Sequence, residues 1–211
     1  TFALMDGLRP HAASFVNYAR GETTAGLRVR LISNDHVETA KAVARRTGIL
    51  SKAEALADEN NREIFGHVML GDDFAKKVGG SKTLQTVTKS SVQCEYEELE
   101  DMEAFSAIAK DLRVLARATA EHKKLFVIGL KALAVSDLLA DYEDPSAEAS
   151  EENKKSALKK RLLEAQCKVS VTGEGISDVD ALKEAQVGLA MGTSCPAAKD
   201  ASQLVIMDNN F

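Results

Sequence analysis

Short apolar segments of strand composition alternate with segments of helical spacing along most of this 211-residue chain, and polar turns separate them. The first unit is an expected strand at Leu27–Ile32, a turn at Ser33–Asp35, and a helix that starts near Val37 and is closed by Gly48. Such alternation predicts an α/β fold with a mostly parallel sheet flanked by helices. In these folds ligands bind beyond the carboxyl ends of strands, so the turns there are the places to search for chemistry.

The same alternation recurs further along the chain. We expect strands at residues 113–116, 169–171, 187–191 and 204–207, and helices at residues 104–110, 121–134, 179–185 and 197–201. Two polar segments interrupt it, a peripheral segment at residues 50–100 and a charged insertion at residues 136–165. The insertion runs from acidic to basic, which favours a solvated loop followed by a charged helix at about Glu151–Gln166. A surface insertion is favoured over a binding tail.

Composition excludes several classes of partner. A net charge of -5, an aromatic fraction of 5% and the absence of Trp give no basis for nucleic-acid binding. The cysteines, Cys94, Cys167 and Cys195, are odd in number and far apart, so we expect no disulfide partner and a reducing setting. The four histidines show no ligand spacing with them. No apolar run has membrane-spanning length and no signal peptide is visible, so we expect the chain to be soluble.

Two of the turns offer groups for a phosphoryl ligand. At Ser33–His36, a hydroxyl and free backbone N–H groups at a helix start suit an anion, while an ordinary helix cap is the alternative. Lys123 lies near the start of an expected helix, where a cation is mildly unfavourable for the helix dipole. That placement suggests a phosphate-facing role, with a solvated lysine as the alternative. If only one of the two adjacent lysines is functional, we expect it to be Lys123 and expect Lys124 to be the surface residue.

A third turn, Thr172–Asp178, joins an expected strand to an expected helix. Gly173 and Gly175 allow the backbone to turn sharply. Glu174 and Asp178 bracket the turn with carboxylates, and such oxygen ligands at a strand end suit Mg²⁺. The alternative is a tight turn followed by a helix that Asp178 caps.

Taken in order, these turns resemble the phosphorylation domain of P-type cation-transporting ATPases, within the Rossmann-like haloacid dehalogenase superfamily. Ser33–His36 stands where the family has Thr-Gly-Asp-Asn, and Glu121–Lys123 stands where it has Asp-Lys. Thr172–Asp178 resembles the family's Thr-Gly-Asp-Gly-x-Asn-Asp, and Asp6–Pro10 resembles its Asp-Pro-x-Arg. With Arg9-Pro10 and the strand Arg113–Arg117, a Gly-Asp-Asp-Phe element at Gly71–Phe74 is most similar to plasma-membrane and plant autoinhibited calcium pumps.

The resemblance implies that residues 1–211 form the C-terminal part of such a phosphorylation domain. Its implied parent is an integral membrane enzyme that couples ATP hydrolysis to ion translocation through an aspartyl phosphate, with Mg²⁺ and ATP as cofactors. The implied partners are the nucleotide-binding, actuator and transmembrane domains of the same parent chain. The implied location is the cytoplasmic face of a membrane.

The resemblance also implies roles for individual residues. Ser33 would hydrogen-bond the phosphoryl oxygens, Lys123 would neutralise them, and Glu174 would coordinate Mg²⁺. We group Asp178 with Ser33 and Lys123 as catalytic residues. Ser177, Gly173 and Gly175 would support the magnesium turn. Asp35 and Arg117 would face the nucleotide near the hinge.

Several residues depart from the family pattern. No Asp-Lys-Thr-Gly occurs, so the family's nucleophile is not in this sequence, and we expect the isolated chain to be inactive. Asn34 and His36 replace Gly and Asn, Glu174 replaces the magnesium Asp, and Ser177 and Asp180 replace Asn and Pro. Glu174 is one methylene longer than Asp, which matters because Mg²⁺ demands near-ideal geometry.

Two hypotheses remain open for a chain with these departures from the family pattern. The first is a fragment of an active cation pump, with Ca²⁺ as the expected ion. The second is a catalytically degenerate pump-like domain with a regulatory or interaction role. A free-standing phosphatase of the same superfamily would need Asp-x-Asp at the end of a first strand, and the sequence has none there.

Overall fold

The computed structural model describes residues 7–21, 26–51, 53–54, 66–87, 93–141 and 169–207. The chain divides into two compact units. Unit 1 comprises Thr1–Phe74, Lys110–Thr119 and Asn210–Phe211, and unit 2 comprises Ala75–Ala109 and Ala120–Asn209. Each unit contains its own three-stranded parallel sheet, so we describe the units separately.

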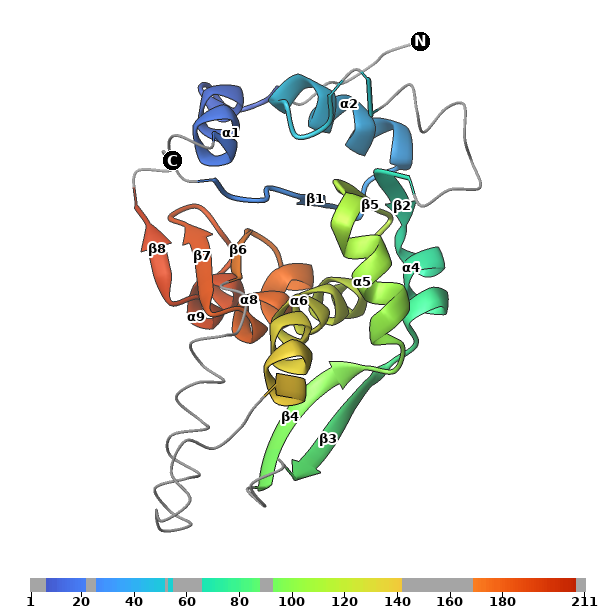
Figure 1. Cartoon of the computed structure of the whole chain (residues 1–211). Helices are drawn as coiled ribbons and strands as arrows, with labels where there is room; N and C mark the ends of the chain where they lie inside the picture. Colours follow the sequence, from blue (N-terminus) through green and yellow to red (C-terminus); the bar gives the residue numbers. More distant parts are fainter. Residues whose placement is uncertain are drawn as a thin grey trace. The chain divides into compact units, whose positions relative to one another are not determined.

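The sheet of unit 1 has the strand order β1-β5-β2. The strands are β1 (Leu31–Ile32), β5 (Val114–Ala116) and β2 (Val68–Leu70), all parallel, with Leu31 and Val68 both paired to Val114. Helix α1 (Ala12–Arg20) precedes β1 in the chain and α2 (Val37–Thr47) follows it; both are blue in Figure 1. Helix α4 (Gly71–Val78) follows β2 directly.

The core of unit 1 is built from α1, α2, the chain after α2 and the central strand β5. Its buried residues are Val16, Ala40, Ala44, Ile49, Leu50, Val114 and Ala116. Ala40 and Ala44 lie one turn apart, so their small side chains form one buried face of α2. Gly48 ends α2 with φ 79°, a left-handed conformation that glycine adopts without strain, which confirms the predicted helix end.

One expectation about unit 1 was wrong, and one helix was missed. The strand expected at Leu27–Ile32 forms only at Leu31–Ile32, because it pairs with β5, which itself begins only at Val114. Helix α1 was not predicted. Only Val16 and Ala19 of α1 are buried, whereas its aromatic residues Phe15 and Tyr18 are exposed, and this obscures the helical pattern.

The sheet of unit 2 has the order β6-β7-β8, drawn in orange and red in Figure 1. It consists of β6 (Ser170–Gly173), β7 (Val187–Met191) and β8 (Leu204–Ile206), all parallel. A 3-10 turn (Ile176–Asp178) and α8 (Val179–Glu184) connect β6 to β7, and α9 (Pro196–Ala201) connects β7 to β8. These elements match the expected strands and helices to within two residues at each end.

Unit 2 also contains α6 (Ala120–Asp141) and an antiparallel hairpin of β3 (Ser81–Val87) and β4 (Gln93–Leu99). Helix α5 (Met102–Asp111) begins in this unit and ends in unit 1. Phe105 of α5 meets Phe126 of α6 edge-on, with ring centroids 5.5 Å apart. The remaining core joins α6 to the parallel sheet through Val127, Val169, Ala181 and Ala185, with a second cluster at Leu182, Ala198 and Ala201.

The fold class is therefore an α/β arrangement of parallel sheets flanked by helices, consistent with a Rossmann-like fold, as predicted. The parallel strands are divided between two sheets, one in each unit. Residues 50–100 contain β2, α4, β3 and β4, none of which the sequence analysis assigned. The charged insertion lies outside the described residues except for the end of α6. Within the described chain, no helix combines the length and apolarity needed to cross a bilayer.

Candidate functional site

The turn after β6 is closed by the carboxylate of Asp178. Its Oδ2 accepts hydrogen bonds from the backbone N–H groups of Glu174 and Gly175, each at 3.0 Å. Its Oδ1 lies 2.7 Å from Nζ of Lys123, which comes from the first turn of α6. One carboxylate therefore fixes the turn and binds a cation 55 residues away in the sequence.

Lys123 is buried, with 7% of its surface exposed. Its ammonium group also donates to Oγ of Ser177 at 3.1 Å. Burial of a lysine is costly without such partners. The alternative of a solvated Lys123 is therefore wrong, whereas the neighbouring Lys124 side chain is 40% exposed, with its Nζ 4.0 Å from Glu97, as expected for a surface residue.

The environment of Asp178 keeps it ionised. Burial alone would raise the pKa of this carboxyl, but the hydrogen bond from Lys123, the hydrogen bonds from the Gly175 and Glu174 amides, and the Lys123 charge outweigh burial. The pKa of Asp178 therefore lies below its ordinary value. Lys123 and Asp178 thus form an ion pair at the carboxyl end of a parallel strand.

The two glycines of this turn differ in what they contribute. A Cβ on Gly173 would lie 2.5 Å from Cβ of Asp178, so the close approach of these residues requires glycine. A Cβ on Gly175 would lie 3.8 Å from Oδ2 of Asp178, an ordinary contact. Steric need thus explains Gly173 but not Gly175.

A second loop, after β7, supports the same turn from another direction. Buried Ser194 donates through Oγ to the carbonyl oxygen of Gly173 at 3.4 Å and accepts from the N–H of Met191 at 2.9 Å. The N–H of Cys195 donates to the carbonyl oxygen of Glu174 at 3.0 Å. Sequence reasoning missed Ser194, although the polar residues Gly192–Ser194 after a strand were the available signal.

The turn after β1 is held by side-chain bonds within the turn and by backbone bonds from the residues after β5. Oγ of Ser33 donates to Oδ2 of Asp35 at 2.7 Å and accepts from the N–H of Asp35 at 3.1 Å. The N–H of Arg117 donates to the carbonyl oxygen of Asp35, and the N–H of Ala118 donates to that of Ser33. Arg117 has φ 53°, a left-handed conformation uncommon outside glycine. Ser33, Asp35 and Arg117 thus lie together at the carboxyl ends of β1 and β5.

The N-cap of α2 is His36. Its Nδ1 accepts from the N–H of Glu38 at 3.3 Å. The turn therefore does contain a helix cap, as the alternative expected, but His36 provides it, while the side chains of Ser33 and Asp35 bond each other. The replacement of the family's Asn by His36 preserves a side-chain acceptor at this position.

No protein-family model matches the chain. Among curated proteins it is similar to calcium-transporting ATPase 2 of Schizosaccharomyces pombe, with 28% identity over 100% of this chain and 11% of that protein. Plasma membrane calcium-transporting ATPase 1 of Homo sapiens is 28% identical over 98% of this chain and 12% of its own length. The sodium/potassium-transporting ATPase subunit alpha-4 of Rattus norvegicus is 27% identical over 89% of this chain and 14% of its length.

The chain is a homologue of the P-type cation-transporting ATPases. The resemblance found in the sequence motifs is thus confirmed, and calcium pumps, one of them from the plasma membrane, are among the relatives. The chain spans about an eighth of the length of the relatives that it matches. It is thus similar to one segment of each of these longer proteins.

The structure gathers the residues that P-type ATPase motifs single out into two groups. Unit 1 holds Ser33, Asp35 and Arg117 around the ends of β1 and β5. Unit 2 holds the turn Gly173–Asp178 together with Lys123. Within each group the residues make direct contacts or are adjacent in the turn. That the two groups form a single phosphoryl site stays a prediction.

Glu174 is the carboxylate of this turn that is best exposed for a metal. Both oxygens of Asp178 are engaged, whereas the Glu174 side chain is exposed at the turn. The described residues contain no group of three acidic, His or Cys side chains that could hold a metal. Mg²⁺ often binds through one or two carboxylates together with phosphate oxygens and water. One carboxylate of this kind is compatible with a magnesium ion that takes its other ligands from phosphate and water, and Glu174 as its ligand stays a prediction.

Proposed function

We propose that this chain is part of the phosphorylation domain of an ATP-driven cation pump, with Ca²⁺ as the transported ion. Two calcium-transporting relatives that align over nearly the whole chain support the choice of ion. In this proposal the chain works at the cytoplasmic face of a membrane. Its partners are the nucleotide-binding, actuator and transmembrane domains of the same parent chain.

The observation that carries the proposal is the buried Lys123–Asp178 pair at the carboxyl end of β6. An ammonium group held in a fixed position neutralises negative charge as it develops on a phosphoryl group, without reorganisation during the reaction. Asp178 and Ser177 orient the ammonium group. Because the amides of Glu174 and Gly175 are bound to Asp178, they shape the turn instead of binding phosphate.

Other residues take supporting roles in this proposal. The hydroxyl of Ser33 would turn from Asp35 to a phosphoryl oxygen, and Asp35 and Arg117 would face the nucleotide. Glu174 would hold Mg²⁺, which neutralises charge on the phosphate when it is bound. The chain contains no Asp-Lys-Thr-Gly, so we propose that catalysis requires an aspartate from elsewhere in the parent.

The test is phosphoenzyme formation from radiolabelled ATP by the full-length parent. Lys123→Ala should lower the phosphoenzyme level by about 100-fold or more, the usual cost of losing one electrostatic stabiliser. Lys124→Ala is the matched control and should leave the level unchanged, because Lys124 is a surface residue. An undiminished phosphoenzyme level in Lys123→Ala would refute the assignment.

The second candidate is a catalytically degenerate pump-like domain with a regulatory or interaction role. The longer Glu174 at the magnesium position and Asp180 in place of the family's proline favour it. In the full-length parent, Glu174→Asp should lower the Mg²⁺ concentration needed for phosphoenzyme formation if the site is active. Absence of phosphoenzyme at every Mg²⁺ concentration, in both wild type and Glu174→Asp, would favour the degenerate domain.

A further inference from the structure

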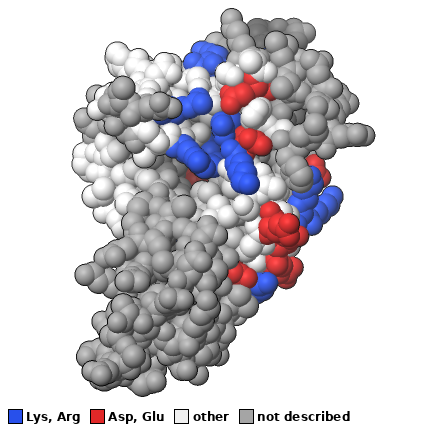
Figure 2. Space-filling model, in the orientation of Figure 1, with Lys and Arg blue, Asp and Glu red and all other residues white. Residues whose placement is uncertain are grey.

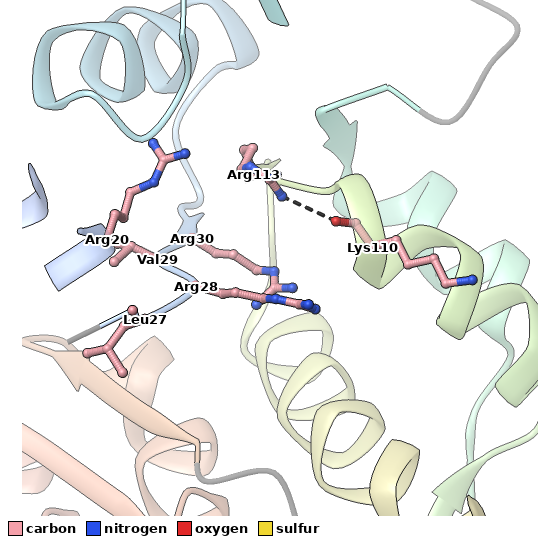
Figure 3. Close-up of a pocket in the computed structure, with 8 residues that line it drawn as sticks. Arg20, Leu27, Arg28, Val29, Arg30, Lys110 and Arg113 are labelled. Atoms are coloured by element: carbon pink, nitrogen blue, oxygen red, sulfur yellow. Dashed lines mark hydrogen bonds between the residues drawn. The ribbon is translucent and has the colours of Figure 1, made fainter. Parts of the chain in front are cut away.

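In several places a cationic side chain donates to carbonyl groups at the end of a helix. In unit 1, Arg20 donates to the carbonyl oxygen of Ile49 just after α2. Arg113 donates to the carbonyl oxygen of Lys110 at the end of α5, a bond that Figure 3 marks with a dashed line. Because the last carbonyl groups of a helix lack partners inside it, such a side chain stabilises the helix end. In unit 2, Lys131 takes this role at the end of α8.

Lys131 is a residue of α6, and it binds Glu184, the last residue of α8, through two acceptors. Its ammonium group donates to the carbonyl oxygen of Glu184 at 3.1 Å and to a carboxylate oxygen of the same residue. The side chains of Lys131 and Glu184 are 25% and 21% exposed. On the face shown in Figure 2, by contrast, the described Lys and Arg side chains lie at the surface and are interspersed with Asp and Glu. The Lys131–Glu184 pair is thus a partly buried contact between two helices.

The two cationic contacts of α6 with α8 lie at opposite ends of α8. Lys123 donates to Asp178, which directly precedes α8, and Lys131 donates to the last residue of α8. Lys123, Val127 and Lys131 are spaced by four residues, so they lie on one face of α6. Between the two lysines, Val127 shares a buried apolar cluster with Ala181 of α8. Helix α6 therefore runs along α8 in the same direction, with a cation at each end of the contact.

The apolar contact between these helices fixes their position along each other less well than the cations do. Burial of Val127 against the small side chain of Ala181 is favourable but not directional. A slide of α6 by the rise of one residue, about 1.5 Å, exceeds the range over which an N–H···O hydrogen bond keeps its strength. The bonds from Lys131 to Glu184 therefore oppose such a slide.

The opposite side of α6 is held by close packing. A Cβ on Gly129 would lie 2.6 Å from the ring of Phe105 of α5 and 2.7 Å from the side chain of Leu99 of β4, so both side chains pack directly on the α6 backbone. Gly129 is two residues from Lys131, which places it on the side of α6 away from α8. This packing opposes rotation of α6, and the bonds of Lys131 oppose its movement along α8.

We propose that Lys131 is a positioning residue for Lys123. By anchoring α6 to the carboxyl end of α8, Lys131 holds the Lys123 ammonium group within reach of Ser177 and Asp178 at the other end. The inference rests on the proposed function, in which Lys123 neutralises charge on a phosphoryl group. A stabiliser of this kind acts without reorganisation only when its position is fixed beforehand.

The first test is phosphoenzyme formation from radiolabelled ATP by the full-length parent. Lys131→Met should lower the phosphoenzyme level about tenfold, because a small misplacement of a catalytic group is costly. Lys131→Arg keeps the charge and the donors, so it should restore the level to within about threefold of wild type. In the background of Lys123→Ala, Lys131→Met should cause a further loss of less than about twofold, since both changes act on the same ammonium group.

A double-mutant cycle on the 211-residue chain, measured by urea denaturation, tests the positioning without ATP. The factor by which Lys123→Met lowers the folding equilibrium constant should shrink about fivefold or more when Lys131→Met is also present. The two lysines are about 12 Å apart along α6, so effects of a merely structural kind would multiply independently. Lys124→Met, which removes an exposed lysine of the same helix, is the matched control and should act independently of Lys131→Met to within about twofold.

Independent effects of Lys131→Met and Lys123→Met in this cycle would overturn the proposal. So would a phosphoenzyme loss by Lys131→Met that is as large in the Lys123→Ala background as in wild type. If Lys123→Ala leaves the phosphoenzyme level undiminished, the proposed function fails, while the cycle still decides whether Lys131 positions Lys123. If Lys131→Met does not fold, Glu184→Gln takes its place in the cycle, because it keeps the carbonyl acceptor and removes only the carboxylate charge. Coupling of the same sign then supports the proposal, and independence overturns it.

Discussion

The turns after β1 and β6 occupy the same place, the carboxyl end of a strand in a three-stranded parallel sheet, yet they are held differently. Ser33 and Asp35 bond each other and the backbone just beyond β5, and both are exposed or half-buried. Asp178 instead bonds Lys123, a buried residue on another helix. The two turns therefore lie at equivalent places in their sheets, but only the turn after β6 is held by a buried charged side chain from another helix.

The largest effect should come from removing the long-range partner. Lys123→Met leaves the Asp178 carboxylate without its cation, and we expect a loss of about 2–4 kcal/mol in the free energy of unfolding, measured by urea denaturation with circular dichroism. Lys124→Met should cost less than about 0.5 kcal/mol, since its pair is exposed. Equal costs for both variants would remove the contrast between the two turns.

The next effect should come from the tight approach at Gly173. Gly173→Ala places a Cβ 2.5 Å from that of Asp178, so we expect a loss of about 1–3 kcal/mol. Gly175→Ala meets only ordinary contacts and should fall within about 0.5 kcal/mol of wild type. Hydrogen exchange by mass spectrometry should show faster exchange around residues 173–178 in the first variant alone. A tolerated Gly173→Ala would show that the turn can relax.

Acid should weaken the turn after β6 through Asp178. Because the folded-state pKa of Asp178 is below the ordinary value of about 3.9, its stabilisation is complete above that value and is lost as the pH falls through the folded pKa. The difference in free energy of unfolding between wild type and Asp178→Asn should therefore be constant from about pH 7 to pH 5 and shrink below about pH 4. A constant difference down to about pH 2 would contradict this.

Unit 1 also contains a carboxyl group whose pKa is lowered, that of Glu54. Burial raises its pKa, but hydrogen bonds from Ser51 and the charges of His67 and Arg113 outweigh burial and lower it. Wild type and Glu54→Gln should thus differ in the same pH window as wild type and Asp178→Asn. A difference between wild type and Glu54→Gln that stays constant down to about pH 2 would contradict this expectation.

The smallest effect should come from the turn after β1. Ser33→Ala removes two local hydrogen bonds in a solvent-accessible turn, so we expect a loss of about 0.5–1.5 kcal/mol. Ser33→Thr keeps the hydroxyl and is the control. If Ser33→Ala destabilises the chain as much as Lys123→Met does, the Ser33 side chain has stabilising contacts beyond its own turn.

The sequence predicted the strands and turns that rely on neighbouring residues. The end of α2 at Gly48 and the positions of β6 and β7 follow from local composition, and the structure confirms them. The family motifs drew attention to Lys123 and Asp178, and the structure places these two side chains in contact. Their pairing across 55 residues cannot be read from spacing, because it depends on how α6 packs against the elements that follow β6.

Other elements escaped prediction for physical reasons. β2 has only three residues, and its place as an edge strand depends on pairing with β5. The hairpin of β3 and β4 is rich in polar residues, so it lacks the alternation expected of a half-buried strand. Ser194 acts through its contact with Gly173, which only the fold brings near. β2 and Ser194 thus depend on partners distant in the sequence, whereas the hairpin is local and was missed because of its polar composition.

The number of donors on Lys123 has a consequence for ligand capture. An ammonium group carries three N–H bonds, and Lys123 uses two, toward Ser177 and Asp178, with no third acceptor among the described residues. An arriving oxyanion can thus be bound through the remaining N–H without breaking the ion pair. Under the proposed function, such binding would require no rearrangement of the Lys123–Asp178 pair or of the turn that Asp178 closes.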